Sequence, residues 1–123
     1  MTGLLFVCLG AMAGAPARYL MDRAVQARHD TLVPWGTILV NLTGSCVLGL
    51  LSGVATGHSV PSGVFLFAGT GFCGAFTTYS AFTYETHRLV ETKRWRHALV
   101  NVTVSVIGGL GAALIGYTVG ALI

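Results

Sequence analysis

Charge is the scarcest feature of this 123-residue chain, in which only 9% of residues are Asp, Glu, Lys or Arg. An ordinary soluble domain has about 25% charged residues, and a domain this small has a large surface relative to its core. Disordered chains are polar and highly charged, whereas 54% of this chain is hydrophobic. The composition therefore excludes a soluble domain and a disordered chain, and it indicates a membrane protein.

Side chains for catalysis or metal binding are also few. The three cysteines, Cys8, Cys46 and Cys73, lie far apart and do not have the spacing of metal ligands. The four acidic residues lie within the charged windows described below, and the four histidines are scattered. We therefore expect that this chain is not an enzyme.

The charges that are present fall into two windows, residues 18–30 and 85–96, and none lies in residues 31–84 or 97–123. A membrane-spanning helix needs about 20 apolar residues, so the charge-free tracts fit whole spans and the charged windows fit loops. The helix-start residues Pro61, Ser62 and Gly63 divide the longer tract. We predict an all-α membrane protein, a single domain of four spans at about 3–20, 34–56, 61–89 and 95–121.

The first span has one competing interpretation. Residues 11–13 (AMA) resemble the cleavage site of a secretory signal peptide. Such peptides begin with a positively charged region, and no Lys or Arg precedes this apolar run. We favour a retained span.

Four spans place both termini on one side of the membrane, and loops one and three on the other. All seven Lys and Arg residues lie on the side of those two loops or at its edge. Because positive loops stay inside, we predict that loops one and three are cytoplasmic, in a multi-pass protein of the cell membrane.

Glycines recur at four-residue spacing, which lets helices approach closely. The pairs are Gly10/Gly14, Gly49/Gly53, Gly53/Gly57 and Gly116/Gly120. This spacing predicts a tightly packed bundle, and four helices alone rarely enclose a pore, so we expect an oligomer.

The third span combines glycines with hydroxyl residues in the run GTGFCGAFTTYSAFT, residues 69–83. A break near residues 74–79 would free backbone carbonyls, which hold Na⁺ or K⁺ in other membrane proteins. An unbroken helix whose Ser and Thr side chains bond to their own backbone fits the composition equally well.

Other polar residues have two interpretations each. Asn41, in the second span, could form a hydrogen bond between helices or donate to an anion through its amide, and Thr37 lies one turn earlier. Arg18 could fix the topology or attract anions to a vestibule. Ser105, one turn after Asn101, is the deeper of two polar residues in the fourth span.

Four stretches together resemble the CrcB/Fluc family of small fluoride channels. They are residues 10–19 (GAMAGAPARY), 35–44 (WGTILVNLTG), 71–82 (GFCGAFTTYSAF) and 101–109. The resemblance extends through nearly the whole chain.

The resemblance implies a passive channel that lets fluoride leave the cytoplasm and so lowers its toxicity. It implies an antiparallel dimer of dual topology with two pores, a third helix broken near the midplane, and a structural Na⁺ at the dimer centre. Backbone carbonyls of Gly74 and Thr77 would hold that ion. The implied pore residues are Asn41, Tyr79, Ser80, Phe82 and Ser105, with Thr37 on the approach and Arg18 at the vestibule.

Two features depart from the family pattern. The family usually has Phe where this chain has Tyr79, and it tends to carry hydroxyl residues where this chain has Gly109 and Ala113. The one-sided charge also fits poorly with subunits that insert both ways. The second subunit is therefore either another copy or a homologue of opposite charge bias.

Two other function classes remain as alternatives. A small four-helix dimeric drug exporter would be expected to need a carboxylate deep in the membrane, and the first two spans have none there. A structural membrane subunit that transports nothing would use its polar residues only to join helices.

Overall fold

The computed structural model describes all 123 residues and contains four helical segments long and apolar enough to cross a membrane. Three are single helices: α1 (Thr2–Arg28), α2 (Trp35–Gly57) and α6 (Trp95–Leu122). The remaining segment, Ser62–Glu91, consists of α3 (Ser62–Phe65), the π-helix η1 (Leu66–Cys73), α4 (Gly74–Phe76) and α5 (Ser80–Glu91). The predicted all-α architecture with four spans is confirmed.

The first helix is longer than the span predicted for it at about 3–20, because α1 continues to Arg28. Side-chain bonds one turn apart support this extension: Arg23 donates to the Tyr19 hydroxyl over 3.2 Å, and Gln26 donates to Asp22 over 3.0 Å. Most of the first charged window is thus helical rather than loop, and Arg18 lies well inside α1.

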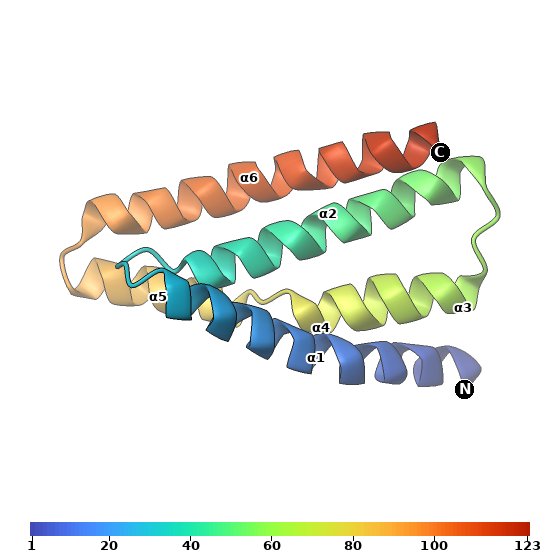
Figure 1. The fold of residues 1–123 in the computed structure, drawn as a ribbon, viewed down its shortest axis with the longest axis horizontal. Coiled ribbons are helices and arrows are strands. Elements are labelled where there is room, and N and C mark those ends of the chain that lie inside the picture. Colours follow the sequence, from blue (N-terminus) through green and yellow to red (C-terminus); the bar gives the residue numbers. More distant parts are fainter.

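The four segments form two pairs (Figure 1). Helices α2 and α6 lie side by side and run in the same direction, whereas α1 packs against η1 and α4. Both chain termini lie at one end of the bundle, and the α1–α2 and α5–α6 connections lie at the other.

The contact between α2 and α6 is made by four buried glycines, Gly49, Gly53, Gly116 and Gly120, which we call the α2–α6 seam. A Cβ atom at any of them would meet backbone of the opposite helix; at Gly116, for example, it would meet the Cys46 carbonyl. The predicted close approach is confirmed for these residues. Gly57 differs, since a Cβ there would meet nothing within 4 Å.

Glycines also bring α1 against the third segment. A Cβ at Gly10 would meet the Phe67 carbonyl, one at Gly14 the Phe72 carbonyl, and one at Gly71 the Val7 carbonyl. The spacing predicted for Gly10 and Gly14 is therefore confirmed as a backbone contact.

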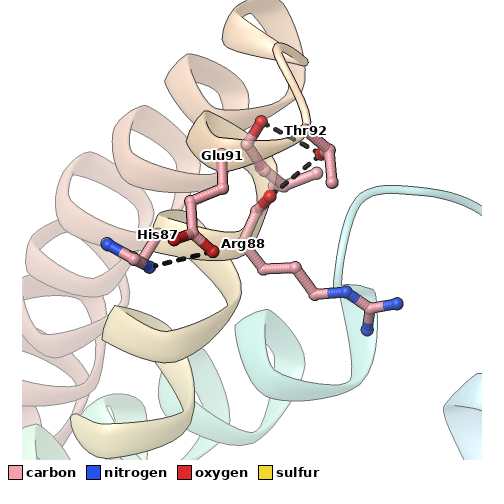
Figure 2. A network of polar contacts seen from close by, with 5 residues as sticks. His87, Arg88, Glu91 and Thr92 are labelled. Atoms are coloured by element: carbon pink, nitrogen blue, oxygen red, sulfur yellow. Dashed lines mark hydrogen bonds and ion pairs between the residues drawn. The ribbon is translucent and has the colours of Figure 1, made fainter.

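The end of α5 closes in a tight turn at Lys93, whose φ of 59° is left-handed. The Lys93 amide bonds to the Val90 carbonyl and the Arg94 amide to the Leu89 carbonyl, the pattern of a Schellman motif. Thr92 donates to the Arg88 carbonyl over 2.9 Å, beside the 3.5 Å contact of His87 with Glu91 (Figure 2). This turn sends the chain directly into α6.

Candidate functional site

An open groove of about 630 Å³ lies between α2, the third segment and α6. It gathers most of the predicted site residues: Asn41, Gly74, Thr77, Tyr79, Phe82 and Ser105. Ser45, Thr70 and Thr78 add further hydroxyl groups to its wall. The groove thus brings amide and hydroxyl groups into a mainly apolar recess on segments of membrane-spanning length.

The third segment changes conformation beside this groove. Helix α4 ends at Phe76, Thr77 is extended with φ −79° and ψ 160°, and α5 begins at Ser80. Asn41 holds the extended stretch from α2: its amide nitrogen donates to the Thr78 carbonyl over 2.9 Å, and its oxygen accepts the Thr78 amide over 2.7 Å. One side chain therefore satisfies both backbone groups of Thr78.

Side chains replace the backbone partners that a continuous helix would supply. In an α-helix, the amide of residue 78 bonds to carbonyl 74 and the amide of residue 81 bonds to carbonyl 77. Here the Thr78 amide bonds to Asn41, and the Ala81 amide bonds to the Thr78 hydroxyl over 3.2 Å. The carbonyls of Gly74 and Thr77 are thereby released from the helical pattern.

The released Thr77 carbonyl faces a cationic group. Arg18 of α1 approaches it with Nη1 at 3.4 Å, so Arg18 contacts the interrupted stretch directly. The Thr77 side chain donates to the Cys73 carbonyl over 2.9 Å. Its methyl group packs where a Cβ at Gly44 would lie, which explains the glycine at this point of α2.

Two aromatic rings lie at the start of α5. The centroids of Tyr79 and Phe82 are 6.1 Å apart and the ring planes are tilted by 43°. Tyr79 is 78% exposed, and both rings line the groove. Ser80 is placed beside them, with its hydroxyl 3.3 Å from that of Thr78, although it is not among the lining residues.

Thr37 lies apart from the groove. It is buried and donates to Glu85 of α5 over 2.9 Å. The other carboxylate oxygen of Glu85 is buried without a partner. Glu85 also lines a second cavity, of about 430 Å³, at the charged end of the bundle, together with Arg88 and Arg94.

On α6, Ser105 lines the groove. A Cβ at Gly109 would lie 3.8 Å from the Ser45 hydroxyl of α2, so a hydroxyl from the neighbouring helix lies next to this position. Ala113 lies in the α2–α6 seam, where its carbonyl meets the site of a Gly49 Cβ.

Sequence reasoning missed the contributions of Thr78 and Glu85. Thr78 acts through its backbone and through the bond of its hydroxyl to Ala81, and a residue type carries no signal for either. The position of Glu85 at the edge of a charged window concealed its contact with Thr37. Only the knowledge that α2 packs against α5 could have indicated that contact.

Comparison with known proteins places this geometry in context. Residues 5–117 match the family model described as CrcB-like protein, Camphor Resistance (CrcB). A protein of Streptomyces avermitilis is 54% identical over 91% of this chain and 90% of its own length. Relatives from Frankia casuarinae and Thermobifida fusca are 51% and 44% identical, over 91% and 94% of this chain and 91% and 92% of their own lengths. All three relatives are named Fluoride-specific ion channel FluC 1.

Proposed function

This chain belongs to the CrcB-like family, and from that membership we propose that it is a fluoride-specific ion channel. The observation that carries the proposal is the groove. It is lined by Asn41 of α2, by Ser105 of α6, and by Tyr79 and Phe82 of the interrupted third segment. Fluoride is small and strongly hydrated, so a pore must replace its water with other hydrogen-bond donors.

The groove supplies uncharged donors of the required kind. The Asn41 amide has two N–H groups, of which one is used by Thr78, so the second can face an anion. Hydroxyls of Ser45, Thr70 and Ser105 also line the groove. Aromatic ring edges are partly positive, which lets Phe82 contact the anion without the strong binding that would trap it.

Transport by these groups is passive. The groove contains no Asp or Glu, whereas a proton-coupled exporter would be expected to need an acidic residue at membrane depth. Fluoride would leave the cytoplasm down its gradient through the channel, and its internal concentration and toxicity would fall.

The groove also supports assembly with a second subunit. It is open on one side and lined by amide and hydroxyl groups, which are costly to expose to hydrocarbon. A second subunit in the inverted orientation would cover it and complete two pores. Another copy of this chain is the subunit that we propose. The one-sided placement of all seven cations makes a homologue of opposite charge bias the specific alternative.

The released carbonyls suit a structural Na⁺ at the centre of that dimer. Gly74 is exposed and lines the groove, and the Thr78 amide that would bond to its carbonyl in a continuous helix bonds to Asn41 instead. Hard cations prefer oxygen ligands, and the Gly74 and Thr77 carbonyls of two subunits would give four neutral ones. The ion would hold the interrupted segments of the two subunits together.

Orientation follows from charge. Arg23 and Arg28 lie toward the end of α1, and Lys93 and Arg94 lie in the α5–α6 connection. The α1–α2 and α5–α6 connections lie at the same end of the bundle, and we propose that this end is cytoplasmic. Arg18, near the Thr77 carbonyl, would attract fluoride toward the interrupted stretch from a vestibule, and Thr37, buried beside Glu85, would line the approach.

Fluoride efflux from proteoliposomes tests the assignment of the groove. We expect Asn41→Asp and Phe82→Ile each to reduce efflux at least about tenfold, which equals about 1.4 kcal/mol in the barrier. Phe6→Ile, the same change on an exposed residue of α1 outside the groove, should leave efflux unchanged. Efflux at the wild-type rate from both groove variants would remove the pore assignment.

A further inference from the structure

A second amide, Asn101 of α6, is fully buried and joins α6 to α5. Its nitrogen donates to the Thr86 hydroxyl over 2.8 Å, and that hydroxyl donates to the Phe82 carbonyl over 2.7 Å. The two bonds form a continuous chain from α6 to the backbone of an aromatic residue that lines the groove. Neither Asn101 nor Thr86 lines the groove itself.

We propose that Asn101 and Thr86 are positioning residues that fix Phe82 in the fluoride pathway. This inference rests on the proposed channel function, and it assigns to the pair a role in conduction beyond joining two helices.

The two hydrogen bonds run in one direction, from Asn101 through Thr86 to the Phe82 carbonyl. A hydroxyl has one hydrogen to donate; because Thr86 gives it to the Phe82 carbonyl, its lone pairs can accept the Asn101 amide. The Asn101 bond thereby keeps the Thr86 hydroxyl directed at Phe82, since rotation of Thr86 would leave a buried amide without a partner. Helix α5 can then neither rotate nor slide along α6 without breaking a bond.

The start of α5 needs such a restraint. The backbone is extended at Thr77 and α5 begins only at Ser80, so the preceding α4 does not fix the rotation of α5. Asn41 holds Thr78 from the α2 side. Asn101 and Thr86 hold the next turn from the α6 side, and Phe82 lies between the two attachments.

The test compares isosteric and conservative variants of Thr86 in proteoliposomes that contain the purified full chain. Thr86→Val removes the hydroxyl at nearly constant volume, and we expect fluoride efflux to fall about tenfold. Thr86→Ser keeps the hydroxyl and should restore efflux to near the wild-type rate. Thr92→Val is the matched control, because the Thr92 hydroxyl makes the same bond to the carbonyl four residues earlier but forms no hydrogen bond to a second helix.

A double-variant cycle separates positioning from stability. Asn101 also accepts a hydrogen bond from Ser105 over 3.5 Å, so Asn101→Leu is the reference for the double variant. If Asn101 and Thr86 act together, adding Thr86→Val to Asn101→Leu should reduce efflux no further than Asn101→Leu alone. Size-exclusion profiles should show the same assembly for every variant compared. If Asn101→Leu fails to assemble, the Thr86→Val and Thr86→Ser pair decides the question alone.

The outcomes are distinct. Wild-type efflux from Thr86→Val, or failure of Thr86→Ser to restore efflux, would overturn the positioning role while leaving the channel intact. A fall in Thr92→Val as large as in Thr86→Val would assign the effect to local bonds within α5 and would also overturn it. No fluoride efflux from the wild-type chain would overturn the channel assignment and this inference together.

Discussion

The α2–α6 seam and the attachment of α5 hold helices together by different means. In the seam, glycines allow backbone to meet backbone. The α2 side chains that bond to another segment, Thr37 and Asn41, reach the third segment instead. Helix α5 is fixed by hydrogen bonds to both neighbours, through Glu85 to α2 and through Thr86 to α6.

This difference distinguishes two regions: the α2–α6 seam is a scaffold, whereas the attachment of α5 supports the site. Helices in lipid gain little from the hydrophobic effect and associate through close packing or through hydrogen bonds. The seam depends on the small volume of its glycines, whereas the attachment of α5 depends on hydrogen bonds between polar side chains. Substitutions that change volume and substitutions that remove polar atoms should therefore act on different regions.

The largest effect should follow from Gly116→Leu in the seam. A side chain there meets the Cys46 carbonyl and the Leu50 amide, which are backbone groups that cannot rotate away. We expect a loss of about 3 kcal/mol or more in the free energy of unfolding, seen as loss of folded protein in detergent. Gly57→Leu, where the space is open, should have a stability close to that of the wild type. Equal stability of the two variants would contradict the role assigned to the seam.

Asn41→Leu should act through the loss of polar atoms rather than through added volume, because the two side chains are nearly equal in size. The Thr78 amide and carbonyl both lose their partner, and each unpaired buried group costs about 1–3 kcal/mol. Fluoride efflux should fall strongly as well. Thermal unfolding measured beside efflux checks this, with Thr118→Val, an exposed hydroxyl on α6, as the control. An Asn41→Leu protein as stable and as active as wild type would contradict it.

Thr37→Val should have a smaller effect at the other attachment. The change removes the donor to Glu85, and loss of one such bond costs about 1–3 kcal/mol. Thr37→Ser should recover most of this loss in thermal unfolding. Equal unfolding temperatures for the Val and Ser variants would show that the bond does not stabilise α5.

The smallest change is expected from Lys93→Gly at the end of α5. A left-handed conformation costs an L-residue about 1–2 kcal/mol, and glycine avoids this cost at Lys93. Unfolding should shift to higher temperature while fluoride efflux stays constant. A lowered unfolding temperature would mean that the Lys93 side chain contributes more than its conformation costs.

The sequence predicts the scaffold better than the site, for physical reasons. Charge-free tracts reveal spans because charge is costly in hydrocarbon, and glycine spacing reveals helix contacts because only glycine allows that approach. The same reasoning does not give the length of the first helix, because charged residues can continue a helix beyond the apolar tract, as they do to Arg28.

The site depends on pairings between segments distant in the chain. The sequence marks Asn41 as a polar residue in a span, but its bonds to the Thr78 backbone depend on where α2 meets the third segment. The bond of Asn101 to Thr86 depends likewise on the turn at Lys93, which brings α6 back along α5.

The most direct test of the central claim is anion efflux from liposomes that contain only this purified chain, with fluoride and chloride measured in parallel. We predict rapid fluoride efflux and no chloride efflux above that of empty liposomes. Fluoride efflux equal to that of empty liposomes, or equal efflux of both anions, would contradict the claim that this chain forms a fluoride-specific channel.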